Sequence, residues 1–335
     1  MPQEKTELYD LVIIGAAAVG TAAAVYAARR RLKFVVVAKD IGGEVALSGV
    51  VDNWPGVVHT TGIELANQFH KHMQSYEVPI DNNTEVVALK QPPPAGGVPL
   101  KAGEKNYHLV VAKDDTGKKK IYKTKTVIIG SGIHPRPLNI PGEKELKGKG
   151  VTSCTVCDGP LYKGKVTATI GAGNSALESA LMMAEIASKV YVLTKYPNTP
   201  DTKGGFPPGE DILIDKLKSL KNVEIVYNAN TKEILGTDHV TGLRYEDEAT
   251  KESKELEVQG VMVHIGVIPN SAFAEGLKKN DLKEIEVDTL CRTNVPGIFA
   301  GGDVTNTPFK QIAIAAGHGV TAALSAIDYL NRWKP

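Results

Sequence analysis

The sequence predicts an α/β protein made of two Rossmann-like three-layer domains, with the second domain inserted in the first. Tyr9–Ile14 and Lys165–Ile170 are each a short apolar strand followed by a glycine-rich turn, a helix and another apolar strand. A later apolar stretch, Val295–Ala300, ends in two glycines and an aspartate. Two such units indicate dinucleotide-binding domains far more strongly than one does, because two glycine-rich turns seldom follow two strands and precede two helices by chance.

The composition describes a globular protein of 335 residues, long enough for two domains of ordinary size. Its net charge of +1 excludes a strongly basic nucleic-acid binder. The polar N-terminus predicts neither a secretory signal nor a transit peptide, and the longest apolar runs are too short to span a membrane. We therefore expect a cytoplasmic protein with no nucleic-acid and no membrane partner.

The first turn, Gly15 to Gly20, has the outline of a dinucleotide-binding turn. Gly15 permits the tight turn, Gly20 lets helix and strand pack closely, and the helix N-terminus attracts a pyrophosphate. Ala17 stands where a second glycine usually lets the phosphate approach. The residue that would bind the ribose is not determined by the sequence. Asp40 has nearly the spacing expected of an acidic ribose ligand, but Lys39 could occupy the end of the strand instead. The alternative for this segment alone is a plain βα turn.

Further glycine-marked segments lie between the two units. Gly42 and Gly43 begin a polar stretch, and residues 63–76 have the apolar spacing of a helix. Asp114–Gly117 predicts a hairpin between strands at 107–112 and 119–122. Another strand, 126–132, ends in Gly130-Ser-Gly132, where the backbone can again approach a cofactor.

Prolines 135, 137 and 141 indicate where the chain leaves the first domain. The predicted domains are 1–134 with 263–335 for the first, and 137–262 for the second.

The second turn, Gly171 to Ala176, keeps both leading glycines in a strand–turn–helix context. The next strand should end in an acid that holds a ribose hydroxyl, or in arginines that hold a 2′-phosphate; it ends in Thr194 and Lys195. Lys195 can attract a phosphate as a point charge but cannot form the paired, bidentate hydrogen bonds that arginine forms. This unit is expected either to bind NADPH or NADH weakly or to have lost nicotinamide binding. The proline- and glycine-rich segment 198–210 is expected to be a mobile loop.

Two cysteines and a carboxylate precede the second unit as Cys154-Thr-Val-Cys157-Asp158. A CxxC beside βαβ patterns is typical of a thiol–disulfide redox motif. Asp158 either moves a proton to or from a thiol or caps a helix. A structural zinc site would also need Cys291 and a histidine, and without a second CxxC we predict no metal site. Cys291 is expected to be a buried small hydrophobe.

Asp303 follows Gly301 and Gly302 and precedes a helical stretch at 310–330. An aspartate at this place can accept a hydroxyl of a cofactor's ribityl chain. The alternative is that Asp303 is a helix N-cap.

These motifs, in this order and spacing, resemble the low-molecular-weight thioredoxin reductase family of flavoprotein disulfide reductases over residues 8–331. The tail 302–330 is especially similar to the reductase component of alkyl hydroperoxide reductase systems. The family's His-Arg-Arg-x-x-x-Arg phosphate clamp is absent, and Thr194-Lys195-Tyr196 stands where it would begin.

The resemblance implies two sets of cofactor contacts. FAD is expected to meet Gly15, Ala17, Gly20, Asp40, Gly42, Gly43, Asn53, Val86, Gly130, Gly132, Gly302, Asp303, Lys310, Gln311 and Ile312. NADPH or NADH is expected to meet Gly171, Gly173, Asn174, Ser175, Ala176 and Lys195.

The resemblance also implies a mechanism, that of an FAD-dependent thioredoxin-disulfide reductase and homodimer. Cys157 would be the sulfur on the flavin side, and Cys154 would attack a thioredoxin-like or peroxiredoxin-type partner through a mixed disulfide. A domain rotation about strands near 133–137 and 260–266 is implied. The electron donor would be NAD(P)H, or alternatively ferredoxin or another donor. A non-catalytic nucleotide-binding sensor is the alternative from another functional class.

Overall fold

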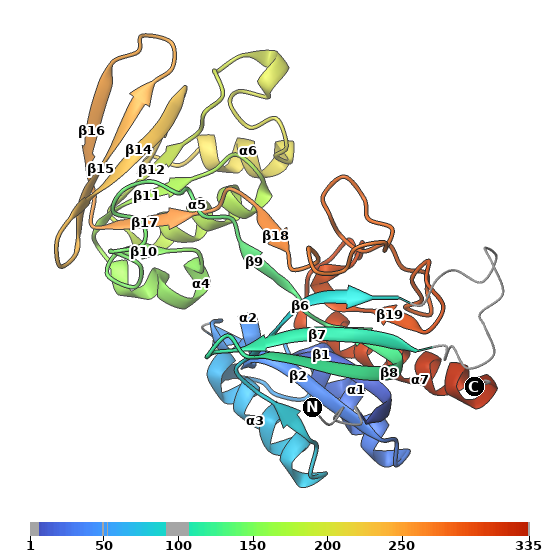
Figure 1. Cartoon of the computed structure of the whole chain (residues 1–335). Helices are drawn as coiled ribbons and strands as arrows, with labels where there is room; N and C mark the ends of the chain where they lie inside the picture. The colour runs from blue at the N-terminus through green and yellow to red at the C-terminus, as the bar shows by residue number, and fades with distance from the viewer. Residues whose placement is uncertain (1–6, 49, 52, 92–106, 334–335) are drawn as a thin grey trace. The chain divides into compact units, whose positions relative to one another are not determined.

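The computed structural model describes residues 7–48, 50, 51, 53–91 and 107–333, except for the side chains of Val50 and Cys157. The chain forms two compact units (Figure 1). Unit 1 joins the residues up to His134 with those from Ile268 onward, and unit 2 is Pro135–Val267. The predicted fold class, two Rossmann-like α/β domains with the second inserted in the first, is confirmed.

Seven strands of the described residues form the sheet of unit 1: β1 (Leu8–Ala16), β2 (Phe34–Ile41), β5 (Ile80–Asp81), β6 (Thr84–Lys90), β7 (His108–Asp114), β8 (Lys119–Ile129) and β19 (Ile298–Ala300). Their order is β5-β2-β1-β8-β7-β6, and β19 also pairs with β8. The pairs from β5 to β8 and the β8–β19 pair are parallel, whereas β6 and β7 are antiparallel additions.

The hairpin predicted around Asp114–Gly117 is confirmed, because β7 and β8 pair antiparallel across it. The division of the following residues into two strands was wrong. β8 runs without a break for 11 residues, since Thr124 is buried and Lys125 makes a 2.7 Å ion pair with Asp10 of β1. The polar residues between the two apolar runs are therefore part of the strand.

Helices and strands cover opposite faces of this sheet. Leu11 and Ile13 face α1 (Ala18–Arg29), α3 (Gly62–Ser75) and α7 (Ile312–Arg332). Val12 and Ile14 point to the other face, where Val86 of β6 joins their hydrophobic cluster. Shorter elements complete the unit: α2 (Gly43–Ala46), β3 (Val50–Val51), β4 (Thr60–Thr61) and the 3₁₀ turn η3 (Gly302–Val304).

Helix α7 is long and apolar enough, by length and composition alone, to cross a membrane, which the inspection of apolar runs did not anticipate. In the structure its alanines are packed in the core of unit 1, with Ala322, Ala323 and Ala326 at most 1% exposed. A methyl group at Gly319 would collide with the carbonyl oxygen of Val19 in α1. The apolar character of α7 is thus explained by its close packing on α1.

Unit 2 has the same three-layer design. Its parallel sheet has the order β10 (Val151–Thr152), β17 (Gly260–Val263), β11 (Val166–Ile170), β12 (Lys189–Leu193) and β13 (Val223–Val226). One face is covered by α5 (Asn174–Ile186) and α6 (Asp211–Lys218), and the other by the antiparallel β14 (Ala229–Gly236), β15 (Val240–Asp247) and β16 (Ser253–Glu257). The short helices are α4 (Thr155–Asp158), η1 (Gly159–Tyr162) and η2 (Pro200–Thr202).

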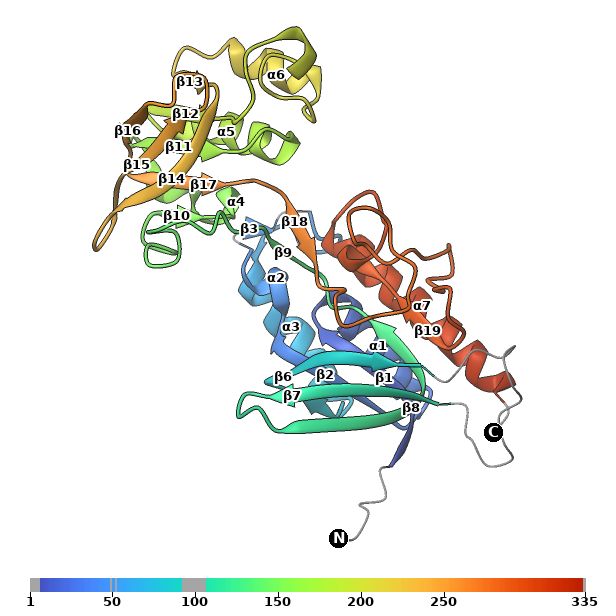
Figure 2. The ribbon, with the colours of Figure 1, turned by 45° about the horizontal axis from the view of Figure 1, so that its top comes forward.

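The chain passes between the two units twice, through β9 (Ile133–Pro135) and β18 (Val267–Pro269). These two strands pair with each other, and both views show them side by side (Figure 2). Backbone hydrogen bonds flank the pair: the Arg136 N–H donates to Gly266 at 2.9 Å, and the Asn270 N–H donates to Gly132 at 3.0 Å. The two connections are therefore joined to each other.

Candidate active site

The turn between β1 and α1 is made of backbone in close contact. Gly15 has a φ of +102°, and a Cβ there would lie 2.3 Å from the carbonyl oxygen of Gly130. A Cβ at Gly20 would lie 1.8 Å from the carbonyl oxygen of Gly15. Only glycine fits these positions, so the turn places the N-terminus of α1 directly above the ends of β1 and β8.

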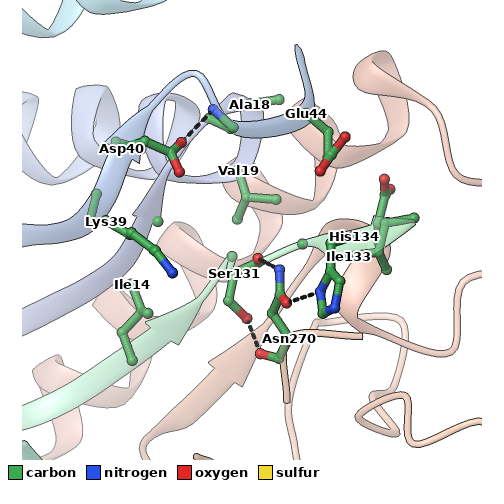
Figure 3. A pocket seen from close by; sticks show the side chains of 18 of the residues that line it. Ile14, Ala18, Val19, Lys39, Asp40, Glu44, Ser131, Ile133, His134 and Asn270 are labelled. Atoms are coloured by element: carbon green, nitrogen blue, oxygen red, sulfur yellow. Dashed lines mark hydrogen bonds between the residues drawn. The ribbon is translucent and has the colours of Figure 1, made fainter. Parts of the chain in front are cut away.

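A cavity of about 1200 Å³ opens at this turn, within unit 1 (Figure 3). Its volume exceeds that of most small-ligand pockets, which suits an extended dinucleotide. Most of the residues predicted to contact FAD line it: Gly15, Ala17, Asp40, Gly43, Val86, Gly130, Gly132, Asp303, Lys310, Gln311 and Ile312.

The other four predicted residues support the walls. Gly20 of α1 packs against Gly15 of β1, Gly302 packs against Val19 of α1 and Ala315 of α7, and the Gly42 N–H donates to Ala16 at 3.1 Å. The Asn53 amide donates to the side chain of Gln311 at 3.1 Å. These residues shape the cavity from behind its surface.

The end of β2 carries both candidates for the ribose contact. Asp40 accepts a hydrogen bond from the Gly43 N–H at 2.9 Å, so its carboxylate also holds the start of α2. Lys39 makes a 3.3 Å ion pair with Glu85 of β6, and all three side chains line the cavity. Ala17 has a φ of −101°, outside the left-handed region that favours glycine, so its backbone conformation accepts a side chain. Sequence analysis did not single out Glu85.

Asp303 lies within η3, and the N-cap of α7 is Gln311, so the alternative that Asp303 caps the following helix is wrong. Burial raises the pKa of Asp303, and the nearby Lys310 charge opposes that shift. Lys310 donates to Glu284 at 2.6 Å and to the Thr305 carbonyl at 2.7 Å. Glu284 is largely buried and also accepts from Asn280 at 2.7 Å. Glu284 thus fixes the lysine that faces the cavity beside Asp303.

His318 of α7 holds the Gly-Gly-Asp turn from the other side. Its Nδ1 accepts a 3.1 Å hydrogen bond from the Gly302 N–H, so this nitrogen carries no proton. Burial, followed by the Lys310 charge, lowers the pKa of His318 and favours that neutral form. Neither Glu284 nor His318 has a sequence signal, because both act through contacts with distant residues.

Ser131 and Asn270 also line the cavity, and they join the segments next to β9 and β18 (Figure 3). The Ser131 hydroxyl donates to the Asn270 carbonyl at 2.7 Å, and the Asn270 amide donates to the Ser131 carbonyl at 2.8 Å. His134 contributes Nδ1 at 2.6 Å from the Asn270 side-chain oxygen. Since a carbonyl oxygen can only accept, this histidine nitrogen is the donor.

The predicted redox motif forms the short helix α4 in unit 2. Cys154 is disulfide-bonded, whereas the side chain of Cys157 lies outside the described residues. Asp158 is at the N-cap of η1 but makes no capping side-chain hydrogen bond there. Cys291, in unit 1, is free and buried as predicted, and burial raises the pKa of its thiol to about 11.

A polar network inside unit 2 anchors the residue that follows Cys154. The buried Thr155 hydroxyl lies 2.5 Å from the Ser179 hydroxyl of α5 and 2.8 Å from Nε2 of His264, which follows β17. Burial lowers the pKa of His264 to about 4, so the ring is neutral at ordinary pH. The redox segment is therefore tied by one side chain to both a helix and the sheet.

The second turn is also made of close-packed backbone. A Cβ at Gly171 would lie 2.1 Å from the His264 carbonyl oxygen. Asn174 begins α5, and its amide donates to Glu210 at 2.8 Å while its side-chain oxygen accepts from the Glu210 N–H at 2.9 Å. Ser175 and Ala176 follow in the first turn of α5, and Ala176 is fully buried. Lys195 lies over the ring of Tyr196, 5.2 Å from its centre.

Comparison with known proteins identifies one matching family and several relatives of similar sequence. The model of the pyridine nucleotide-disulphide oxidoreductase family matches residues 9–319. The chain is 37% identical over 332 residues to the F subunit of the alkyl hydroperoxide reductase of Escherichia coli K12, covering 98% of this chain and 60% of that protein. This chain thus spans about 60% of the length of the curated relatives it matches.

Solved structures match over nearly their full length. The thioredoxin reductase of T. acidophilum is 36% identical, covers 97% of this chain and 99% of its own, and has a TM-score of 0.69. The thioredoxin reductase of Streptococcus pyogenes MGAS5005 is 28% identical, with 98% and 100% covered and a TM-score of 0.73.

Replacing Glu284 by glutamine should destabilise unit 1 by about 2 kcal/mol, because the Lys310 ammonium group would keep its burial but lose its anion. The measurement is the free energy of unfolding in urea. Glu286→Gln is the matched control, since Glu286 pairs with the exposed Lys278 and its loss should cost at most about 0.5 kcal/mol. Equal losses in the two variants would contradict the role given to Glu284.

The stability of the protein should fall as pH drops from about 6.5 to 4, partly through His264. In that window the unfolded histidine gains a proton and the folded one does not, which costs about 3 kcal/mol by pH 4. His264→Gln should remove this part of the pH dependence of the melting temperature. His239→Gln, which changes an exposed histidine of the same unit, is the control. A wild-type pH dependence in His264→Gln would refute the assignment.

Proposed function

The chain belongs to the pyridine nucleotide-disulphide oxidoreductase family, and we propose that it is an FAD-dependent reductase of protein disulfides. Electrons would pass through FAD and the Cys154–Cys157 pair to a disulfide of a thioredoxin-like or peroxiredoxin-type protein. The enzymes of this family use FAD and NAD(P)H. The thioredoxin reductases and the alkyl hydroperoxide reductase component among the relatives support this choice of partner.

The observation that carries the proposal is the cavity of unit 1 with its donor set. The N-terminus of α1 opens into it with only the small side chains of Ala17 and Ala18 and that of Val19 at its first residues, which suits a pyrophosphate. Asp303 and Lys310 line it, offering a carboxylate to ribityl hydroxyls and an ammonium group to a carbonyl or phosphate oxygen. These residues fit FAD, which when bound and reduced by the electron donor would supply the two electrons that open the Cys154–Cys157 disulfide.

The protein's own chemistry is thiol–disulfide exchange. The Cys154 thiolate attacks the partner's disulfide, one partner thiol leaves, and a mixed disulfide forms. Cys157 then attacks the Cys154 sulfur, so the partner departs with two thiols and the Cys154–Cys157 disulfide is restored. Asp158 is proposed to exchange a proton with a thiol, and the absence of a capping hydrogen bond from its side chain supports this over the helix-cap alternative. The Thr155 network would hold the redox segment during both steps.

The donor is the finer part of the proposal. The glycines of the second turn and Asn174, Ser175 and Ala176 are proposed to meet NADPH or NADH, with Lys195 near the phosphate. A specific observation favours the alternative of ferredoxin or another donor: Glu210 already lies against Asn174. We further propose a cytoplasmic homodimer.

Purified protein should be yellow, and Cys154→Ser should keep its flavin absorbance but lose at least about 99% of its turnover with a thioredoxin-like disulfide protein. The serine oxygen cannot form the mixed disulfide. Turnover is followed after reduction of the flavin by dithionite, so the result does not depend on the natural donor.

Cys291→Ser is the matched control for this experiment. It changes a buried cysteine outside the motif, and it should retain turnover. A colourless protein, or undiminished turnover in Cys154→Ser, would reject the enzyme and favour a non-catalytic nucleotide-binding sensor.

A further inference from the structure

The segment Lys195–Glu210, which we name the closing loop, connects β12 to α6. Connections of this kind usually have about two to six residues, and this one is longer, with only the short η2 inside it. Residues 198–210 were expected to form a mobile loop, and the structure gives this segment an anchor. Phe206 is 0% exposed and packs in the helical core of unit 2 with Leu177 of α5. The loop therefore has a fixed place beside α5.

The end of the loop occupies the N-terminus of α5. Glu210 and Asn174 exchange two hydrogen bonds, of 2.8 and 2.9 Å, at the first residue of this 13-residue helix. Backbone N–H groups and the helix dipole attract anions to such a position, which is where a dinucleotide places its pyrophosphate. The Glu210 carboxylate accepts from the side-chain amide of Asn174, the first residue of α5, and so brings a negative charge of the chain itself close to this helix end.

The loop also borders the approach to the second glycine. In a dinucleotide-binding turn this glycine leaves room for the pyrophosphate to reach the backbone. Here a Cβ built on Gly173 would be 3.9 Å from a ring carbon of Pro208, an ordinary van der Waals distance. The space that the missing side chain should leave for a ligand is bordered by the loop.

Thr194, at the strand end where a ribose contact would be expected, is also hydrogen-bonded to the loop. Thr194 is 1% exposed, and its hydroxyl donates to the Gly205 carbonyl at 2.6 Å. A side chain that is buried and already donating cannot present its hydroxyl to a ribose. The contrast with unit 1 is clear, because there the strand-end residues Lys39 and Asp40 line an open cavity.

We propose that the closing loop is an internal competitor of the nicotinamide dinucleotide and that Glu210 sets the donor specificity of the enzyme. This rests on the proposed function. NADPH or NADH binds at the second turn only in molecules whose Pro208–Glu210 segment has moved away. Pro208 and Glu210 are exposed and Phe206 is buried, so the segment can move while Phe206 stays in the core. Gly209, which is buried between the two exposed residues, becomes exposed in the open form.

The consequence for affinity follows from the fraction of open molecules. If one molecule in about a hundred is open, the apparent Kd for the dinucleotide rises about a hundredfold. A donor that reduces the flavin without binding at this turn is unaffected by the loop. The loop therefore disfavours NADPH and NADH relative to any such electron carrier.

The test compares the FAD-loaded wild type with Glu210→Ala. NADH and NADPH are titrated separately, and the readouts are bleaching of the flavin under anaerobic conditions and binding of the oxidised nucleotides by calorimetry. Glu210→Ala should lower the apparent Kd for at least one dinucleotide by about tenfold, equivalent to about 1.4 kcal/mol. Asp215→Ala, which removes an exposed carboxylate from α6, should leave it unchanged.

Limited trypsin digestion gives a readout that is independent of activity. Lys203 is an exposed residue of the loop. Its cleavage should be faster in Glu210→Ala and should rise in the wild type when saturating dinucleotide is added. Pro208→Gly, which leaves the Glu210 pair in place, is the second variant and should show a smaller gain in affinity.

An equal Kd in wild type and Glu210→Ala, or cleavage at Lys203 that dinucleotide slows, would overturn the proposal. Binding and proteolysis do not require disulfide reduction. If Cys154→Ser retained its turnover, the proposed function would fail and the loop experiment would still be decided on its own readouts.

Discussion

Unit 1 depends on the contact of three backbone segments at Gly15, Gly20 and Gly130, where no side chain can be accommodated. Their approach brings α1 onto the ends of β1 and β8. Val19 of α1 then supports two further glycines, because its side chain contacts the position of a Cβ at Gly302 and its carbonyl contacts that at Gly319. The Gly-Gly-Asp turn and α7 are thus positioned on α1, and the cavity lies where these elements meet. Its shape follows from how closely the backbone packs.

What could be predicted from the sequence is what local chemistry determines. The glycine turns, the hairpin at Asp114 and the acid after Gly302 need only neighbouring residues, and the structure has them at the expected places. Contacts between distant residues left no such signal. Lys310 meets Glu284 across 26 positions, and Thr155 meets His264 across 109.

Strand β8 was predicted as two separate strands because of the polar residues in its middle. The sequence Lys123-Thr-Lys125 interrupts two apolar runs and has the polarity of a turn. Its long-range partner cannot be seen locally: Lys125 meets the Asp10 carboxylate, and the hydroxyl of the next residue, Thr126, donates to the Asp10 carbonyl. Tertiary contacts therefore override the polarity of the segment and make it the middle of a strand.

The two units have similar glycine-rich turns, but the surroundings of the turns differ. Both turns have leading glycines forced by close backbone approach, at Gly15 and at Gly171. The first faces an open cavity, and the second is met by the chain's own Pro208 and Glu210. The turn sequence determines the backbone, but the connection after the next strand determines what the turn is able to receive. A motif alone is thus an incomplete guide to a ligand.

The pairing of β9 with β18 makes unit 2 an inserted domain whose two ends lie side by side. Its two ends leave unit 1 as hydrogen-bonded neighbours, and the entropy cost of closing the stretch between them grows only slowly with its length. Any domain whose own ends lie side by side satisfies the same junction, whatever its size or fold. The junction thus depends on the spacing of the two ends of the inserted domain and not on its length.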